Sequence, residues 1–243
     1  MWDRITSLVT LSRRAARKGI TMAKLGVLVV GQGPRPEIES ELARHLNGVE
    51  LDLRGCLDGL DAAEIAALAP DGDEPELFTR LPTGASVTLS KREVVRRGES
   101  QLDALERSGA DVVVMLCTGG FPGWAGRRVL FPDVIFGHFV RGVQPRGHLG
   151  VLTPLPSQLA DAEARWTGGD HRVTAVALSP NAGKDETAAA GRQLAAAAPD
   201  LLVLDCVSYT REMKATLCRA TGRPGALAIS CIARVVGEVL DTG

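Results

Sequence analysis

The sequence predicts an α/β fold of two similar lobes with mainly parallel sheets, and three observations support this prediction. First, short aliphatic runs alternate along the chain with longer runs of helical periodicity. Second, most of the aliphatic runs are apolar throughout, which is typical of parallel strands that helices cover on both faces. Third, the first half of the chain resembles the second half. Alternating strands and helices are the pattern of α/β domains.

The first half opens with the aliphatic run KLGVLVVG, and the later run VELDLRG alternates with period two. Pro36 and the acidic residues after it favour a helix start, because proline fits a first turn and acids interact favourably with the helix dipole. Gly109 is a typical residue beyond a helix end. The expected strands are 24–31, 49–55, 85–90 and 111–117, and the expected helices are 36–46, 61–70 and 91–109.

In the second half, the apolar run VIFGHFV is expected to form a strand, and the alanine-rich run DETAAAGRQLAAAAP is expected to form a helix. The run DLLVLDC reads as a buried strand that ends in a cysteine. The expected strands are 134–140, 148–154, 172–179, 200–206 and 226–231, and the expected helices are 157–168, 185–199, 210–222 and 232–240.

The internal repeat predicts where the two lobes lie. The segment from 24 resembles that from 148, and the segment from 108 resembles that from 197, so that Asp111 matches Asp200 and Cys117 matches Cys206. The first lobe carries about 35 extra residues, mostly within 54–90. We expect the closing strand and helix to return to the first lobe. The expected parts are an extension at 1–21, lobe 1 at 22–121 plus 223–243, and lobe 2 at 122–222.

Composition excludes several classes of protein. The 243 residues carry a net charge of −1 and only 4% aromatic side chains, so there is no basic field or stacking platform for nucleic acid. No apolar run reaches the length of a membrane span. Five cysteines without a C-x-x-C pair or zinc spacing predict a reduced, cytoplasmic protein with no metal site. A homodimer is possible. We expect the basic segment 1–21 to be a frayed or packing extension, or to result from an upstream start codon. The alternative is a targeting helix.

Cys117 and Cys206 are the candidate catalytic residues. Ligands of open α/β sheets bind beyond the carboxyl ends of the strands, and two facing lobes would place both cysteines on one cleft. One thiolate could then remove a proton from a carbon acid while the opposite thiol delivers a proton to the other face. Taken singly, a free cysteine is more often a small core residue, but the matched setting favours a site. We assign the remaining cysteines to packing: Cys56, Cys218 and Cys231. Asp205 is expected to brace a neighbouring loop.

The loops beside the two cysteines supply the candidate substrate-binding residues. In GQGPRP, Arg35 could pair with a carboxylate, although an ordinary turn with a solvated arginine is the alternative. The loop lacks the third glycine of a dinucleotide fingerprint. LSKRE is expected to be a solvated helix start, with guarding of the mouth of the site as the alternative. CTGGFPGW is expected either to close over a ligand or to serve as a hinge. The full set of substrate-binding candidates is Gln32, Arg35, Thr118, Gly119, Ser208 and Tyr209.

Four stretches resemble the AroM family, a branch of the aspartate/glutamate racemase superfamily. They are VVGQGPRPEI, TLSKREV, VVVMLCTGG and LLVLDCVSYTREM, and the resemblance extends from about Lys24 to Leu240. It implies two Rossmann-like lobes related by a pseudo-two-fold axis, an active site between them, and two cysteines acting as acid and base without a cofactor. Cys117 and Cys206 fall where those cysteines would lie, and Thr118 follows Cys117 as in related loops.

This chain departs from the glutamate-type racemases at two loops. Val207, Ser208 and Tyr209 follow the second cysteine in place of Thr-His-Tyr, and Gln32 and Arg35 stand in place of an acidic–serine pair. The resemblance therefore does not imply a dicarboxylic amino acid as the substrate. Our first expectation is a racemase or epimerase of a small carboxylate. The alternatives are a cis-trans isomerase or decarboxylase of a small diacid that uses one cysteine, and a non-catalytic metabolite-binding protein.

Overall fold

The computed structural model describes residues 22–241, and the expectation for segment 1–21 lies outside the described residues. The described chain divides into two compact units. One contains residues 22–132 and 233–241, and the other contains residues 133–232.

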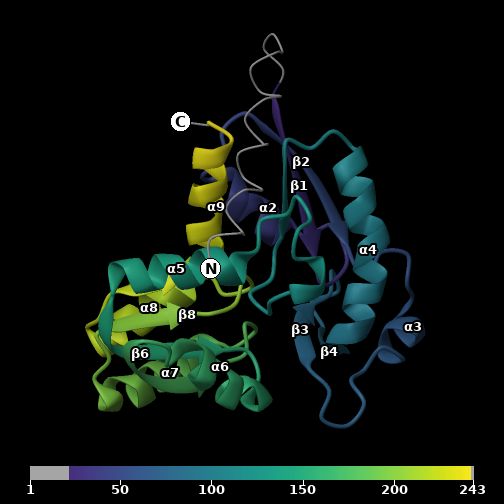
Figure 1. Cartoon of the computed structure of the whole chain (residues 1–243). Helices are drawn as coiled ribbons and strands as arrows, with labels where there is room; N and C mark the ends of the chain where they lie inside the picture. Colours follow the sequence, from purple (N-terminus) through teal and green to yellow (C-terminus); the bar gives the residue numbers. More distant parts are fainter. Residues whose placement is uncertain (1–21, 242–243) are drawn as a thin grey trace. The chain divides into compact units, whose positions relative to one another are not determined.

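The first unit is built on a three-stranded parallel sheet of order β2–β1–β5. Helices α2 and α4 lie on opposite faces of this sheet (Figure 1). The long helix α4 buries an apolar stripe that includes Leu102 and Leu105, as expected for an amphipathic helix on a sheet. The strands are β1 (Ala23–Val29), β2 (Val49–Gly55) and β5 (Val112–Met115), and the helices are α2 (Pro36–Ala43), α3 (Ala62–Ala66), α4 (Lys91–Arg107) and the short η1 (Pro122–Trp124).

An antiparallel hairpin of β3 (Glu76–Arg80) and β4 (Ser86–Ser90) precedes α4. Strand β4 was expected from the sequence, but β3 was not, because Pro75 and Pro82 bound a run of only five strand residues. The hairpin lies within the insertion that distinguishes the first half of the chain.

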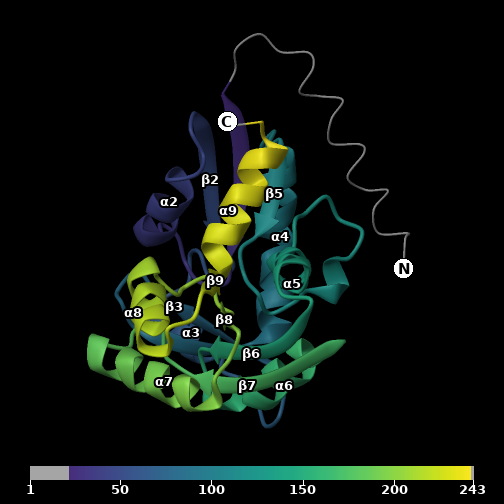
Figure 2. The same cartoon turned by 90° about the vertical axis from the view of Figure 1, so that its left-hand side faces the viewer.

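The second unit is built on a four-stranded parallel sheet of order β7–β6–β8–β9. Helices α7 and α8 pack side by side, and α6 packs on β6 and β7 (Figure 2). The strands are β6 (Arg146–Thr153), β7 (Asp170–Ala177), β8 (Leu201–Leu204) and β9 (Gly225–Leu227). The helices are α5 (Pro132–Val143), the short η2 (Pro156–Gln158), α6 (Leu159–Trp166), α7 (Lys184–Ala197), α8 (Arg211–Thr221) and α9 (Ala228–Val239).

The repeat read from the sequence is present in the hydrogen bonds of the two sheets. The Asp111 carboxylate accepts the backbone N–H of Lys24 at 2.9 Å, and the Asp200 carboxylate accepts that of His148 at 2.8 Å. Each acid thus ties the start of its own strand to the start of the neighbouring central strand. The central strands pair in the same register, since Leu25 lies opposite Val112 as Leu149 lies opposite Leu201.

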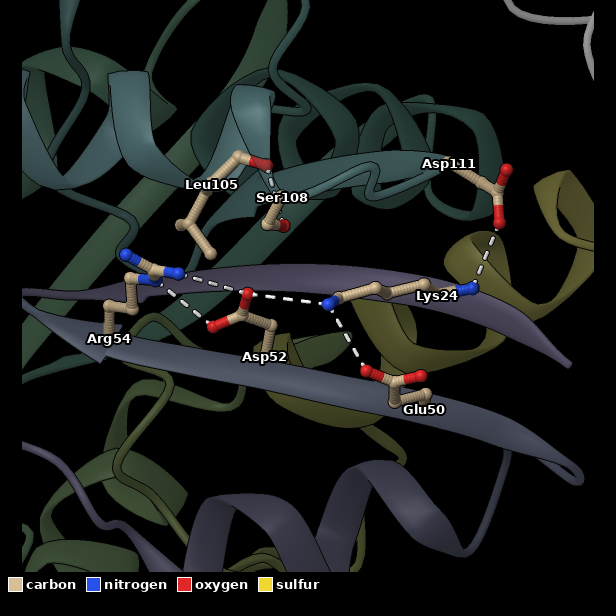
Figure 3. Close-up of polar contacts among 7 residues, drawn as sticks. All are labelled: Lys24, Glu50, Asp52, Arg54, Leu105, Ser108 and Asp111. Atoms are coloured by element: carbon tan, nitrogen blue, oxygen red, sulfur yellow. Dashed lines mark hydrogen bonds and ion pairs between the residues drawn. The ribbon is translucent and has the colours of Figure 1, made fainter.

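Lys24 adds a charged cluster at this end of the first sheet (Figure 3). Its ammonium lies 3.1 Å from the Glu50 carboxylate and 3.6 Å from that of Asp52, both on β2. Arg54 pairs with the same Asp52 at 3.0 Å. Lys24 and Glu50 lie near the amino ends of their strands, and the cluster extends along β2 from there to Arg54.

Two expectations about the second half are wrong. Segment 134–140, expected to be a strand, belongs to helix α5, because Phe136 and Val140 are one helical turn apart and both pack into the core of the second unit. Segment 226–231 is a strand only up to Leu227, and its strand pairs with β8 of the second unit instead of returning to the first. Helix α9 starts in the second unit, and its residues from Ala233 belong to the first.

Candidate functional site

Cys117 lies two residues beyond the end of β5, and its sulfur is a hydrogen-bond acceptor. The backbone N–H of Gly119 donates to the sulfur over 3.3 Å. Glycine leaves room at this position: a Cβ on residue 119 would lie 2.5 Å from a methyl group of Leu77 and 3.3 Å from the sulfur, so the Leu77 side chain would have to shift. The side chain of Cys117 is half-buried, and Thr118 between the two residues is buried.

Cys206 lies beyond β8 and repeats this arrangement in the second unit. Here the backbone N–H of Ser208 donates to the sulfur over 3.4 Å. Cys206 itself is 8% exposed. Both candidate thiols therefore occupy the matched strand ends that the sequence predicted, and each accepts an N–H from the second residue after it.

Tyr209 follows Ser208, but its hydroxyl has a partner within the protein. It donates to the Leu178 carbonyl over 2.6 Å, and the ring is 2% exposed. Burial, together with the nearby Cys206, raises the pKa of the Tyr209 phenol well above its ordinary value. The phenol therefore stays protonated and ties the loop after β8 to the end of β7.

Asp205 precedes Cys206 and is buried, with helix α6 as its partner. Its carboxylate accepts the indole N–H of Trp166 over 2.7 Å and also pairs with Arg165. Both of these partners lie on helix α6. Leu116 occupies the matching position in the first unit, because the backbone N–H groups of Leu116 and Asp205 bond to the matching carbonyls of Leu28 and Leu152.

The loop after β1 carries Gln32 and is held by two side-chain contacts. The Gln32 amide donates to the carbonyls of Leu57 and Leu60 over 3.2 and 2.8 Å. The Asp58 carboxylate accepts the N–H groups of Gly33 and Gly55, both over 2.8 Å. Because Leu57, Asp58 and Leu60 follow β2, the loop after β1 is tied to the end of the neighbouring strand.

Arg35 is 3% exposed and therefore not the solvated arginine of an ordinary turn. Its guanidinium donates to the Glu37 carboxylate over 2.6 Å. Burial acts to raise the pKa of Glu37, but the hydrogen bond and charge of Arg35, with the charge of Arg80, hold this pKa below its ordinary value. Arg35 is thus partly used by Glu37, and any substrate carboxylate would share the guanidinium with that acid.

The β3–β4 hairpin contributes residues to this strand-end region that the sequence did not reveal. A Cβ on Gly31 would lie 2.6 Å from the Thr79 hydroxyl, and one on Gly119 would meet Leu77, so β3 contacts both loops. Lys91, which follows β4, donates from its ammonium to the Gly119 carbonyl over 2.9 Å. The missed strand β3 explains why Thr79 and Leu77 were not candidates, whereas LSKRE had pointed to Lys91.

The other cysteines lie in packed surroundings. Cys56 is 2% exposed, and burial raises the pKa of its thiol far above the ordinary value, with smaller contributions in the same direction from Cys117 and Asp58. Burial also raises the pKa of Cys218. Cys231 packs in the core of the second unit. None of the five cysteines is in a disulfide.

The predicted site residues form two groups, one in each unit. Gln32, Arg35, Cys117, Thr118 and Gly119 follow β1 and β5, whereas Cys206, Ser208 and Tyr209 follow β8. Across residues 22–241, no three His, Cys, Asp or Glu side chains are grouped so that they could bind a metal ion. Over the same residues, no helix has the length and apolar character needed to cross a membrane.

Several solved structures share the fold of this chain. An arylmalonate decarboxylase superposes with a TM-score of 0.60 at 12% identity, covering 90% of this chain and 93% of that chain. A maleate cis-trans isomerase mutant of Nocardia farcinica, with a covalently bound succinylcysteine intermediate, gives 0.58 at 16% identity and covers 91% and 94%. Glutamate racemase of Francisella tularensis in complex with D-glutamate gives 0.58 at 10% identity and covers 91% and 82%.

The fold is therefore that of the aspartate/glutamate racemase superfamily. The chain belongs to the AroM protein family, whose model matches residues 25–240. The resemblance read from the sequence is confirmed. No curated protein sequence matches the chain significantly.

Proposed function

We propose that this chain is a cofactor-independent racemase or epimerase of a small carboxylate, with Cys117 and Cys206 as its acid–base pair. The observation that carries the proposal is the matched environment of the two sulfurs. Each lies at the end of an equivalent strand, and each accepts a backbone N–H from the second residue after it, over 3.3 and 3.4 Å. An N–H that points at sulfur stabilises a thiolate relative to a thiol, which is what a proton-abstracting cysteine requires.

The proposed reaction needs the two thiols on opposite faces of one substrate carbon. The thiolate of one cysteine takes the proton next to the carboxylate, and the thiol of the other delivers a proton to the opposite face. The first cysteine ends as a thiol and the second as a thiolate, so protons balance and the next turnover runs in the reverse direction. Thr118, Ser208 and the loop of Gln32 and Arg35 are the proposed groups for the substrate carboxylate.

A second candidate function uses one cysteine as a nucleophile or as a single proton donor. The succinylcysteine of the similar maleate isomerase is a covalent adduct of this kind, and a decarboxylase would instead protonate a carbanion. The two thiols also differ in exposure, since Cys117 is half-buried and Cys206 is 8% exposed. That asymmetry favours Cys117 as the attacking thiolate for an unsaturated diacid. A metabolite-binding protein without turnover is the remaining alternative.

Deuterium wash-in tests the first proposal. The protein is incubated in D₂O with amino acids and with small hydroxy and dicarboxylic acids, and loss of the α-proton is followed by NMR. We expect exchange that Cys117→Ser and Cys206→Ser each abolish and that Cys218→Ser leaves intact. Conversion of maleate to fumarate without α-exchange, abolished by Cys117→Ser, would favour the nucleophilic mechanism. Binding of a pool member without exchange or conversion would favour the binding protein.

A further inference from the structure

Lys91 is fixed in position by the elements on both sides of it. It is the first residue of α4, and the preceding Ser90 caps the helix by accepting the backbone N–H of Glu93 over 3.3 Å. Its own backbone N–H donates to the Pro75 carbonyl over 2.9 Å. The backbone from which the Lys91 side chain extends is thus held by both the hairpin and the helix.

The ammonium of Lys91 lies against the loop that follows Cys117. It donates to the Gly119 carbonyl over 2.9 Å and lies 5.7 Å from the centre of the Phe121 ring. A cation over an aromatic face is attracted to the ring. These two contacts place a positive charge beside the segment whose N–H bonds to the sulfur.

Gly119 links the lysine to the thiol. Its N–H donates to the Cys117 sulfur, its carbonyl accepts from Lys91, and its α-carbon faces Leu77 with no room for a side chain. A glycine without such contacts has wide backbone freedom. The direction of the N–H at the sulfur therefore depends on the contacts that hold residue 119.

We propose that Lys91 is a positioning residue for Cys117, which holds Gly119 with its N–H on the sulfur and places a positive charge near the developing thiolate. The role rests on the proposed function of Cys117 and adds to it a residue from outside the two cysteine loops. The proposed role concerns Cys117, because Lys91 bonds to the loop that follows this cysteine.

Other titratable and charged groups near Cys117 are buried or hydrogen-bonded to other partners. Cys56 interacts with Cys117, but burial keeps it a neutral thiol by raising its pKa. Asp58 and Arg97 act on Cys56: Asp58 accepts two backbone N–H groups, and Arg97 donates to the Cys56 carbonyl over 3.2 Å. Lys91 differs from these groups because it bonds to Gly119, the residue whose N–H donates to the Cys117 sulfur.

The test is the pH dependence of Cys117 alkylation by iodoacetamide, read by mass spectrometry of the peptide that contains it. Lys91→Met is expected to raise the pH midpoint by about 0.5 unit and to slow alkylation at pH 7 about threefold. Lys91→Arg keeps a cation and a donor, so its midpoint should stay close to that of the wild type. The matched control is Lys184→Met. Like Lys91, Lys184 is the first residue of a helix, but its side chain is exposed and its ammonium lies 3.3 Å from the Glu212 carboxylate.

Lys91→Gln separates the two parts of the role, because it keeps a donor for the Gly119 carbonyl but no charge. A midpoint like that of the wild type would assign the effect to orientation, and one like that of Lys91→Met would assign it to charge. If both neutral variants fold, as judged by circular dichroism, and match the Lys184→Met midpoint, the proposal is overturned. Since alkylation needs no substrate, this result is independent of the wash-in experiment. The role of Lys91 can be refuted while proton exchange is observed, and proton exchange can be absent while the role of Lys91 is supported.

Discussion

Asp205 offers the sharpest test of how the second unit supports its cysteine. The carboxylate is 4% exposed and accepts the indole N–H of Trp166, which is itself 2% exposed, over 2.7 Å. The substitution Asp205→Leu removes this acceptor and leaves a buried donor without it. Leucine is a suitable replacement because Leu116 occupies the matching position of the first unit and is buried there.

The cost can be worked out from the contacts. A buried donor that loses its acceptor costs about 1–3 kcal/mol, and a bond to a charged acceptor lies toward the upper part of that range. The ion pair with Arg165 adds at most about 1 kcal/mol, because the arginine side chain is 39% exposed and its charge is screened by solvent. We therefore expect Asp205→Leu to lower the free energy of unfolding by about 2–4 kcal/mol. Asp205→Asn keeps an acceptor oxygen and should cost about 1 kcal/mol.

Urea unfolding followed by circular dichroism measures these differences, and a double-mutant cycle with Trp166→Phe isolates the hydrogen bond. We expect a coupling of at least about 1 kcal/mol between the two positions. A loss of less than about 0.5 kcal/mol in Asp205→Leu, or no coupling with Trp166→Phe, would refute the reasoning. Leu116→Asp is the reverse control and should be strongly destabilising, since it buries a carboxylate at the matching position of the first unit.

Three further predictions concern packing, pH and the thiol environment. Gly98→Ala should cost about 1–3 kcal/mol in urea unfolding, because a Cβ there would lie 2.7 Å from the Trp124 ring, whereas Gly123→Ala, which meets nothing within 4 Å, should be near neutral. Burial and the charge of Arg172 hold the pKa of His148 below its ordinary value of 6.5, so its contribution to stability is full above pH 6.5 and is lost as pH falls from there through the folded-state pKa. His148→Gln should flatten that part of the stability–pH curve, and an unchanged slope would contradict the assignment. Gly119→Ala should slow alkylation of Cys117 while leaving that of Cys206 unchanged, and equal rates at Cys117 in variant and wild type would show that the Gly119 N–H does not matter.

Much of the fold could be predicted from the sequence because its signals are local. Continuous aliphatic runs marked β1, β5, β6 and β8, and the prolines, glycines and acidic first turns marked the helices between them. The prediction of a strand at VIFGHFV was wrong because a short apolar run does not by itself distinguish a strand from a buried helix. Only the packing of Phe136 and Val140 shows that this segment is a helix. Strand β3 was not predicted because it is short and lies between prolines.

The sequence alone determined that two related units each place a cysteine just after a buried strand, since the repeat aligns Cys117 with Cys206 and Asp111 with Asp200. Only the tertiary structure decided what the neighbouring side chains bind: Tyr209 bonds to Leu178, Asp205 to Trp166, Arg35 to Glu37 and Lys91 to Gly119. The physical reason is that strand periodicity is a property of consecutive residues. Most of these partners, by contrast, come from segments far apart in the chain, and which of them meet is set by how helices and hairpins pack on the sheets.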